Sequence, residues 1–309
     1  MKASADLAFI FPGQGSQSVG MGAEWARRSP AAARTFEEAD AALGEPLSKL
    51  CWEGPAETLQ LTENTQPAIL TVSIAIWRSL PEDLRPAWMA GHSLGEYSAL
   101  VAAGALEFSD AVRLVRQRGR LMQQAVSVGE GAMAAIIGLD SAAVEELVAA
   151  ASSATEICAV ANYNSPEQTV VAGAAAAVDR LLPLAKERGA KRALPLPVSA
   201  PFHSPMMEAA RVGLAPYLEA ATFRDPVAKV VSNVDAQVIA DGEAARDGLL
   251  RQVDGAVRWV ESIRLMADSG VARFVEVGPG KVLTGLARRI APGLSYLSVA
   301  EPDALGQLG

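Results

Sequence analysis

The sequence has 309 residues, enough for about two domains of roughly 150 residues each. Its 27 Lys and Arg residues stand against 35 Asp and Glu residues, a net charge of −8, and this acidic balance argues against nucleic acid as a partner. Every unbroken apolar run is well short of the roughly 20 residues that a membrane-spanning helix needs, so no membrane interaction is expected. The two cysteines, Cys51 and Cys158, lie far apart with no histidine nearby. This spacing predicts neither a metal site nor a disulfide framework and favours a cytoplasmic location.

Strands and helices alternate in the outer parts of the chain. Apolar runs that end at glycine or at Pro-Gly predict buried strands at 7–11, 87–90 and 274–277. Apolar residues at helical spacing predict helices at 65–77, 94–105 and 110–124. Because strands that alternate with helices usually pair in parallel, we expect an α/β fold with a parallel sheet.

The middle of the chain has the order strand, helix, strand, strand, helix, strand. The predicted strands are 132–138, 157–163, 168–173 and 191–196, and the predicted helices are 141–151, with Ser141 as its N-cap, and 174–188. This order is the split βαβ arrangement of a ferredoxin-like unit. We therefore expect a small domain at 129–197, inserted into a larger α/β domain that consists of residues 1–128 and 198–309.

The pentapeptide Gly91-His-Ser-Leu-Gly95 matches the G-x-S-x-G pattern of a nucleophile elbow. A predicted strand precedes it and a predicted helix follows, which is the context that such an elbow requires. The glycines allow a sharp turn that exposes the Ser93 hydroxyl, and the helix N-terminus directs N–H groups toward a developing oxyanion. Ser93 is therefore the candidate nucleophile. The alternative is a chance match in a glycine-containing turn.

Only two histidines are available as a base for this serine, His92 and His203. His92 adjoins Ser93, and neighbouring side chains in a sharp turn usually project in different directions, so we expect it to pack behind the elbow. His203 lies in a proline-flanked loop, where a scaffold often presents functional groups, and by elimination it is the predicted base. A surface or capping histidine is the alternative. No aspartate stands out as the acid that would orient the His203 ring, and a backbone carbonyl is able to orient it instead.

Several motifs occur in order along nearly the whole chain: Phe11-Pro-Gly-Gln-Gly-Ser-Gln17, Asn64-Thr-Gln-Pro-Ala68, Gly91-His-Ser-Leu-Gly-Glu96, Arg118-Gly-x-x-Met-Gln123, Asn162-Tyr-Asn-Ser-Pro166, Phe202-His203-Ser204 and Val277-Gly-Pro-Gly280. Together they resemble the malonyl-coenzyme A:acyl carrier protein transacylases of fatty acid synthesis and the related polyketide acyltransferase domains. The resemblance implies a hydrolase-like α/β core that carries a ferredoxin-like insert, in agreement with the predicted order of elements.

The resemblance also implies how the residues act. Ser93 would attack the thioester of malonyl-CoA with His203 as base and form an acyl-serine. The backbone amides of Gln14 and Leu94 would hold the oxyanion, and Arg118 would bind the free malonyl carboxylate, a task that suits a planar guanidinium. The phosphopantetheine thiol of acyl carrier protein would then accept the malonyl group in a ping-pong scheme, with no permanently bound cofactor.

Three further positions match the family. The backbone carbonyl of Gln252 would orient the catalytic histidine, although an ordinary polar helix residue is the alternative. Asn162 would lie near the cleft between the domains, with a structural turn role as its alternative. Phe202 resembles the bulky residue that crowds an α-methyl group in malonyl-selective members.

The residues alone do not single out one arginine. Arg118 shares its segment with Arg113, Arg116 and Arg120, and a solvated helix face explains all four. Its assignment to the substrate carboxylate therefore rests on the resemblance.

Other functions compete with this interpretation. An α/β-hydrolase that acts as a thioesterase or lipase shares the serine elbow, but its histidine usually comes late in the chain, whereas about a third of this chain follows His203. A catalytically inactive carrier-docking module would leave Ser93, His203 and Arg118 idle. Service to a polyketide pathway or to a malonate decarboxylase stays open, because both use the same transfer.

Docking of an acidic carrier protein on this acidic chain requires a local basic patch. The candidate clusters are Lys186, Arg188, Lys191 and Arg192, or Lys281, Arg288 and Arg289. For either cluster a solvated surface is the alternative. The protein is expected to act as a monomer.

Overall fold

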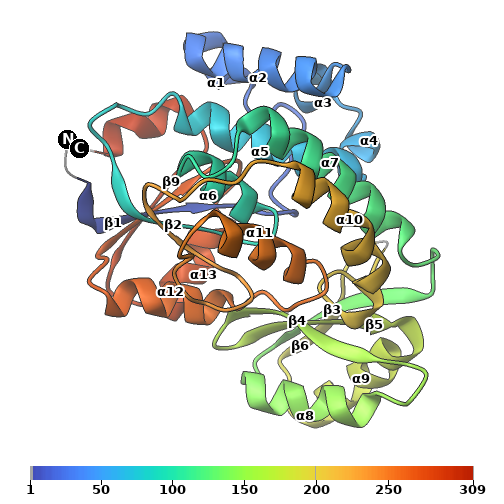
Figure 1. The fold of residues 1–309 in the computed structure, drawn as a ribbon. Coiled ribbons are helices and arrows are strands. Elements are labelled where there is room, and N and C mark those ends of the chain that lie inside the picture. Colours follow the sequence, from blue (N-terminus) through green and yellow to red (C-terminus); the bar gives the residue numbers. More distant parts are fainter. Residues whose placement is uncertain (1–2, 199, 309) are drawn as a thin grey trace.

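Two separate β-sheets organise the protein (Figure 1). The computed structural model describes residues 3–198 and 200–308. Elements from the beginning and the end of the chain form the larger sheet and its helices, and elements from the middle form the smaller sheet. Figure 1 shows the smaller sheet beside one end of the larger unit.

The larger sheet has five strands in the order β7-β2-β1-β8-β9. These are β1 (Ser4–Phe11), β2 (Pro86–Gly91), β7 (Lys229–Val231), β8 (Arg273–Val277) and β9 (Ser295–Val299). All of their pairings are parallel, so the predicted parallel α/β sheet is confirmed. β7 and β9 were not predicted; β7 has only 3 residues, too few for a recognisable alternation.

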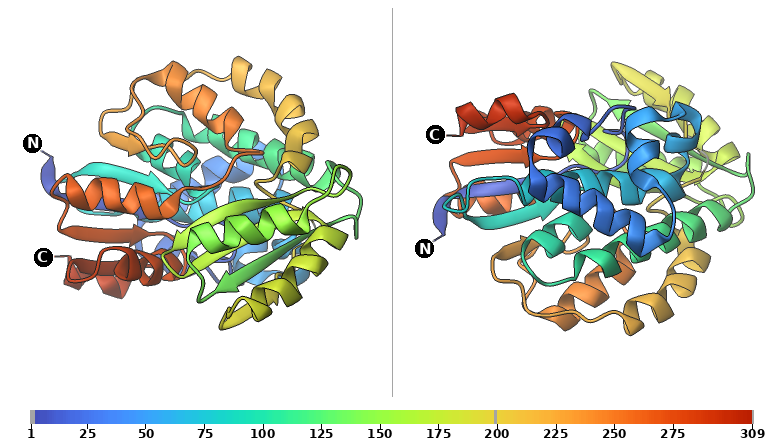
Figure 2. Two further views of the ribbon diagram at one scale, coloured as in Figure 1. Left: turned by 90° about the horizontal axis from the view of Figure 1, so that it is seen from below. Right: turned by 90° about the horizontal axis from the view of Figure 1, so that it is seen from above.

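Helices cover both faces of the larger sheet (Figure 2). They are α1 (Ala23–Arg28), α2 (Pro30–Leu43), α3 (Leu47–Glu53), α4 (Ala56–Gln60), α5 (Thr62–Trp77), α6 (Gly95–Ala102), α7 (Phe108–Gln124), α10 (Glu208–Ala220), α11 (Gly242–Arg251), α12 (Trp259–Asp268) and α13 (Val282–Ile290), with short 3₁₀ helices at Pro205–Met207 and Pro302–Gln307. Within the described ranges, none of the helices is both long and apolar enough to span a bilayer.

The side chains of β1 alternate between two cores, as the pleat of a strand requires. Leu7, Phe9 and Phe11 are buried in the larger core together with residues of α2, α5, α6 and α7. Ala8 and Ile10 are buried on the opposite face, against α12 and α13. This strand is therefore apolar at every position from 7 to 11, which is the continuous run that predicted a buried strand.

The smaller sheet is antiparallel and has the strand order β4-β5-β3-β6. Its elements are β3 (Gly131–Ile137), α8 (Ser141–Ala151), β4 (Cys158–Ser165), β5 (Gln168–Ala174), α9 (Ala175–Glu187) and β6 (Arg192–Pro195). Both helices pack on one face and close a separate core. The predicted ferredoxin-like βαββαβ unit is confirmed. The division into 1–128 with 198–309 and 129–197 stays a prediction, with the sheet changing after α7 and again after β6.

The N-cap of α8 differs from the predicted one. Asp140, in an extended conformation, accepts a hydrogen bond from the backbone N–H of Ala143 at 2.8 Å. Ser141 is already the first helical residue, so its prediction as the N-cap was wrong. Both residue types are good caps, and the local sequence does not decide which of two adjacent candidates takes the extended conformation.

This difference gives a test with a built-in control. Replacing Asp140 with Ala removes the acceptor for an N–H in the first turn, and we expect the free energy of unfolding to fall by about 1 kcal/mol. Ser141→Ala should change it by a few tenths of a kcal/mol at most, because the serine side chain does not cap the helix. Urea denaturation followed by circular dichroism measures both; a larger loss for Ser141→Ala would contradict the assignment.

Candidate active site

Ser93 sits at a sharp turn between β2 and α6. Its backbone φ is +52°, in the left-handed region that side chains rarely adopt. The flanking glycines permit this turn because a Cβ on Gly91 would lie 1.9 Å from the carbonyl carbon of Gly95, and a Cβ on Gly95 would lie 2.0 Å from the carbonyl oxygen of Phe11. The glycines of the pentapeptide are therefore required by packing.

Asn233, which the sequence analysis missed, holds this turn through two hydrogen bonds to its backbone. Its Oδ1 accepts the backbone N–H of Ser93 at 2.7 Å, and its Nδ2 donates to the carbonyl oxygen of Gly91, also at 2.7 Å. The side chain is fully buried. Asn233 lies two residues after the end of β7, so the short strand that pairs with β2 positions this side chain at the elbow.

The structure brings His203 to Ser93. The Nε2 atom of His203 lies 2.6 Å from the Ser93 hydroxyl oxygen. Its Nδ1 atom lies 2.9 Å from the carbonyl oxygen of Gln252 and 3.1 Å from that of Gly255. Carbonyl oxygens only accept hydrogen bonds, so Nδ1 carries the proton and Nε2 is left to accept from the serine. Two main-chain carbonyls thus take the place of an orienting acid.

The environment of His203 keeps the imidazole neutral. Burial, and then the positive charge of Arg118, lower its pKa from 6.5 to about 3. The side chain is only 4% exposed. A neutral imidazole next to a serine hydroxyl is the form that is able to take up a proton.

Arg118 differs from the other three arginines of α7 in its partners. Arg113 pairs with Asp110, Arg116 with Glu45 and Arg120 with Glu63. Arg118 is 2% exposed and forms no ion pair with a carboxylate in the described part of the chain. The structure therefore separates Arg118 from the other three arginines of α7, which the sequence could not do.

The contacts of Arg118 are with neutral groups around the nucleophile. Nη2 donates to the Ser93 hydroxyl oxygen at 3.2 Å and to Oε1 of Gln252 at 2.8 Å, while Nη1 donates to Oε1 of Gln66 at 2.7 Å. Its guanidinium also lies 5.7 Å from the centre of the Tyr97 ring. A buried cation without a paired carboxylate, next to the nucleophile, is suited to receive an anionic substrate.

The remaining predicted residues line a cavity of about 180 Å³ in front of Ser93 and His203. Its walls include Gln14 and Leu94, which were predicted to bind the oxyanion. They also include Asn162 and Phe202, which were predicted to line the substrate pocket. A larger cavity of about 630 Å³ lies between α7 and α10, but Ser93, His203 and Arg118 are not among the residues that line it. We therefore place the site in the smaller cavity.

The ring of His92 bonds Asn164, whereas it is His203 that bonds the Ser93 hydroxyl. The Nε2 atom of His92 lies 2.8 Å from Oδ1 of Asn164, and its ring meets Trp259 edge-on with centroids 5.6 Å apart. Burial lowers its pKa. It contacts β4 and α12, in agreement with the expectation that it packs behind the elbow.

Two more buried residues were missed. Glu96 follows the elbow, is fully buried, and burial raises its pKa to about 7. Gln66 holds Arg118 from α5. Glu96 was visible in the motif Gly91–Glu96 but its role was not, because its partners lie 137 to 156 positions further along the chain.

The chain is similar to a known protein family and to known proteins over most of its length. Residues 8–293 match the family model described as "Acyl transferase domain". The malonyl CoA-acyl carrier protein transacylase of Escherichia coli (strain K12) is 51% identical over 301 residues, which are 97% of this chain and 97% of that protein.

Solved structures agree with the sequence relatives. An acyl carrier protein S-malonyltransferase from Vibrio cholerae has a TM-score of 0.96 at 47% identity, over 98% of this chain and 100% of that chain. A malonyl-transacylase in complex with its type II PKS acyl-carrier protein has a TM-score of 0.95 at 46% identity, over 98% of both chains.

The serine elbow with its histidine is the arrangement of enzymes that pass an acyl group through a serine ester. The chain belongs to the acyl transferase domain family, and within it to the malonyl CoA-acyl carrier protein transacylases.

The lowered pKa of His203 predicts the acid limb of the pH profile. Because the neutral imidazole is the active form and its pKa falls from 6.5 to about 3, acidification through pH 6.5 should not protonate it. We expect kcat/KM for acylation of Ser93 to show no acid limb near 6.5. Unfolding of Ser93→Ala at each pH is the control for acid denaturation; an acid limb with an apparent pKa of 6.5 or above would contradict the prediction.

The two histidines should differ in their effect on activity. His203→Ala removes the base and should lower kcat by roughly 10²- to 10⁴-fold with little change in Tm. His92→Ala removes the contacts with Asn164 and Trp259, so it should lower Tm and leave kcat within about tenfold of the native value. Steady-state kinetics and thermal unfolding of both variants measure this, and an equal loss of kcat would count against the assignment.

Proposed function

We propose that this protein transfers the malonyl group of malonyl-CoA to the phosphopantetheine thiol of acyl carrier protein, in fatty acid biosynthesis. The observation that carries the proposal is Arg118: a buried guanidinium without a carboxylate partner among the described residues, 3.2 Å from the nucleophilic oxygen. A thioester substrate that also bears a free carboxylate matches this pair of groups. Acyl-CoA substrates without a free carboxylate on the acyl group would leave the cation unpaired.

In the first half-reaction, Ser93 attacks the thioester carbonyl while His203 Nε2 takes the hydroxyl proton. The supporting observation is their 2.6 Å separation. Gln14, in the loop after β1, and Leu94, just before α6, both line the cavity. Their backbone N–H groups are assigned to the negative charge that develops on the carbonyl oxygen. The imidazolium then gives its proton to the sulfur, and coenzyme A leaves an acyl-serine.

In the second half-reaction, the same groups work in reverse. His203 takes the proton of the phosphopantetheine thiol, the thiolate attacks the acyl-serine, and the proton returns to Ser93. The malonyl carboxylate stays paired with Arg118 in both steps. Because the first product leaves before the second substrate binds, the kinetics are ping-pong.

Two residues complete the proposed pocket. Phe202 is buried beside His203 and lines the cavity, which supports its role in crowding an α-methyl group. Asn162 lines the cavity from β4, so the smaller sheet supplies part of the wall.

A second candidate is service to a polyketide pathway. One solved relative, 46% identical, is a malonyl-transacylase bound to its type II PKS acyl-carrier protein. The chemistry at Ser93, His203 and Arg118 would be identical, and only the carrier protein would differ. A hydrolytic thioesterase is less well supported, because the similar proteins at 51% and 47% identity are a transacylase and an S-malonyltransferase.

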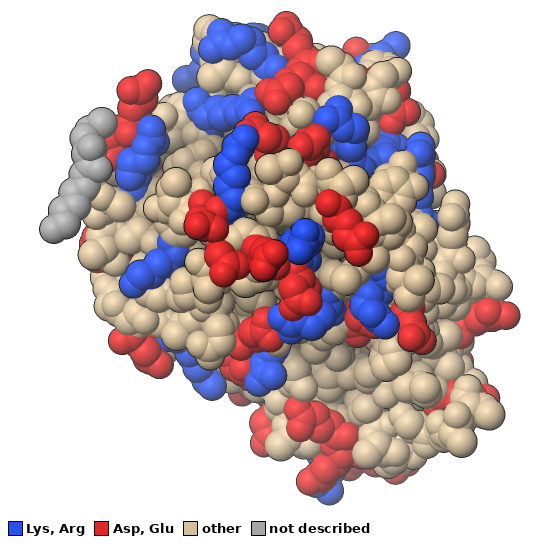
Figure 3. All heavy atoms as spheres, in the orientation of Figure 1, with Lys and Arg blue, Asp and Glu red and all other residues tan. Residues whose placement is uncertain are grey.

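Of the two basic clusters, we favour the one on α13 for docking the carrier protein. Residues of α13 line a small cavity together with Gln14 and His92, which also border the active-site cavity. In the other cluster, Arg188 pairs with Glu146 and Lys191 with Glu167, which reduces its net charge. On the face shown in Figure 3, basic and acidic side chains are interspersed, without one broad basic field.

A cytoplasmic location and a monomeric state are also part of the proposal. The two cysteines, Cys51 and Cys158, are buried thiols, which is usual for a protein of a reducing compartment. No permanently bound cofactor is needed for the proposed steps.

Mass analysis tests the proposed function. After mixing with malonyl-CoA, we expect one malonyl group on the peptide that contains Ser93, absent from Ser93→Ala. Addition of holo acyl carrier protein should discharge it and yield malonyl-carrier protein. Release of free malonate without a carrier, at a rate equal to that of discharge, would overturn the proposal in favour of a hydrolase.

A further inference from the structure

The carboxylate of Glu96 is buried without a directly paired cation. The residue lies in the first turn of α6 and is fully buried. Across the described ranges it forms no ion pair with Lys or Arg, and its Oε1 atom has no hydrogen-bond partner. Burial of an unpaired carboxylate is costly, so its place beside the active site requires an explanation.

A glutamine side chain joins this carboxylate to the active-site arginine. Glu96 Oε2 accepts a hydrogen bond from Nε2 of Gln252. The other end of the same carboxamide, Oε1, accepts from Nη2 of Arg118 at 2.8 Å. The cation and the anion are therefore connected through a neutral amide and do not touch.

The polarity of the amide makes this connection directional. Its NH₂ group donates to Glu96 Oε2 and to the carbonyl oxygen of Ser93 at 3.0 Å. These two acceptors fix the NH₂ end, which turns the oxygen toward Arg118. The reversed amide would place its NH₂ group against the guanidinium, donor against donor. Glu96 and the Ser93 carbonyl together determine which end of the Gln252 side chain faces Arg118.

The indirect connection leaves the guanidinium free for a ligand. A direct ion pair with Glu96 would occupy two donors in the fork geometry that carboxylates prefer. Through the amide, Gln252 occupies one N–H of Nη2, the other donates to the Ser93 hydroxyl oxygen, and the Nε–H group has no hydrogen-bond partner in the described ranges. The negative charge of the ionised acid still favours the charged arginine. Arg118 is held in place and still available for a carboxylate.

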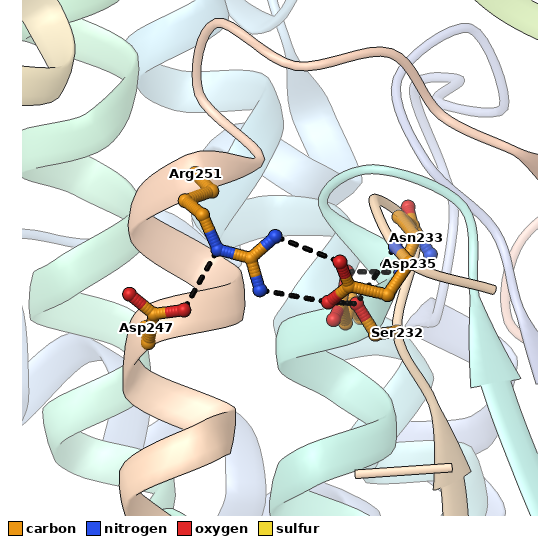
Figure 4. Close-up of polar contacts among 6 residues, drawn as sticks. Ser232, Asn233, Asp235, Asp247 and Arg251 are labelled. Atoms are coloured by element: carbon orange, nitrogen blue, oxygen red, sulfur yellow. Dashed lines mark hydrogen bonds and ion pairs between the residues drawn. The ribbon is translucent and has the colours of Figure 1, made fainter. Parts of the chain in front are cut away.

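A surface ion pair supports the relay from outside (Figure 4). Arg251, which precedes Gln252, binds both carboxylate oxygens of Asp235 at 2.7 and 2.8 Å and Asp247 at 2.7 Å. Asp235 belongs to the same turn as Asn233, whose backbone N–H donates to Glu96 Oε2 at 3.3 Å. The turn after β7 and the end of α11 are thereby joined around Glu96.

We propose that Glu96 is a positioning residue for acyl-group selection, which holds the Gln252 carboxamide so that Arg118 faces the carboxylate of the acyl group. This inference rests on the proposed malonyl transfer. It assigns no contact between Glu96 and the substrate; the residue acts through Gln252.

The test compares two thioesters that differ only in the carboxylate, malonyl-CoA and acetyl-CoA. In Glu96→Ala the Gln252 amide loses one of its two acceptors and keeps only the Ser93 carbonyl, so the orientation of its oxygen toward Arg118 is less firmly held. We expect kcat/KM for Ser93 acylation by malonyl-CoA to fall at least tenfold, mostly through KM, and the value for acetyl-CoA to change less than threefold. Glu96→Gln keeps an oxygen acceptor for Gln252 and should restore malonyl kcat/KM to within about threefold of the native value.

Glu276 provides a matched control. It is also a fully buried glutamate, but its oxygens accept the backbone N–H groups of Leu283 and Thr284 at the start of α13. Glu276→Gln should lower Tm and leave the ratio of the two kcat/KM values unchanged. A stability effect alone would therefore not imitate the expected result.

If Glu96→Ala does not fold, Glu96→Met removes the same acceptor for Gln252 while it keeps most of the side-chain volume. We expect the same selective loss for malonyl-CoA. Equal losses for both thioesters, or no loss, in the folded variant would overturn the relay. Failure of the native protein to form malonyl-Ser93 would instead overturn the proposed function.

Discussion

The left-handed backbone at Ser93 is the constraint on which the site depends. A non-glycine residue with φ of +52° costs of order 1–3 kcal/mol and persists only where its surroundings hold it. Here close packing at Gly91 and Gly95 and two hydrogen bonds from Asn233 hold it. The turn that results places the serine hydroxyl at the mouth of α6, between the histidine and the helix N-terminus. In the proposed mechanism, the nucleophile, its base and the oxyanion amides all depend on this one conformation.

Around the elbow, buried polar groups take the place of solvent. Gln252 connects four residues around the elbow: its main-chain carbonyl accepts from His203 Nδ1, and its side chain bonds Arg118, Glu96 and the carbonyl of Ser93. In a low-dielectric site each of these bonds is stronger than in water, and each unsatisfied group is more costly. A single residue at the end of α11 therefore couples the orientation of the His203 ring to that of the Arg118 guanidinium.

The two sheets meet at the cavity, which gives the inserted unit a functional place. The larger sheet supplies Ser93 and Gln14, and the smaller sheet supplies Asn162 and Val170 to the same wall. The strand β4 is attached to the larger unit by main-chain bonds in which Tyr163 donates to Val257 and Val257 donates to Ala161. A ladder of this kind fixes the wall against the elbow. The size and shape of the acyl pocket therefore depend on the junction of the sheets more than on either sheet alone.

Local chemistry in the sequence determined β1, β2 and β8 of the larger sheet, the βαββαβ order of the smaller one and the serine elbow, because periods of two or 3.6 residues and glycines at a turn act over short distances. It did not show the edge strands β7 and β9. The base could be chosen because only two histidines exist, whereas Arg118 could not be told from its neighbours, since helical spacing does not record which arginine meets a carboxylate. Only the tertiary structure decided that, together with the Asn233 clamp and the link from Glu96 through Gln252 to Arg118. These contacts join side chains that lie far apart in the chain, and their distances are fixed by how the helices and strands pack, which no local pattern contains.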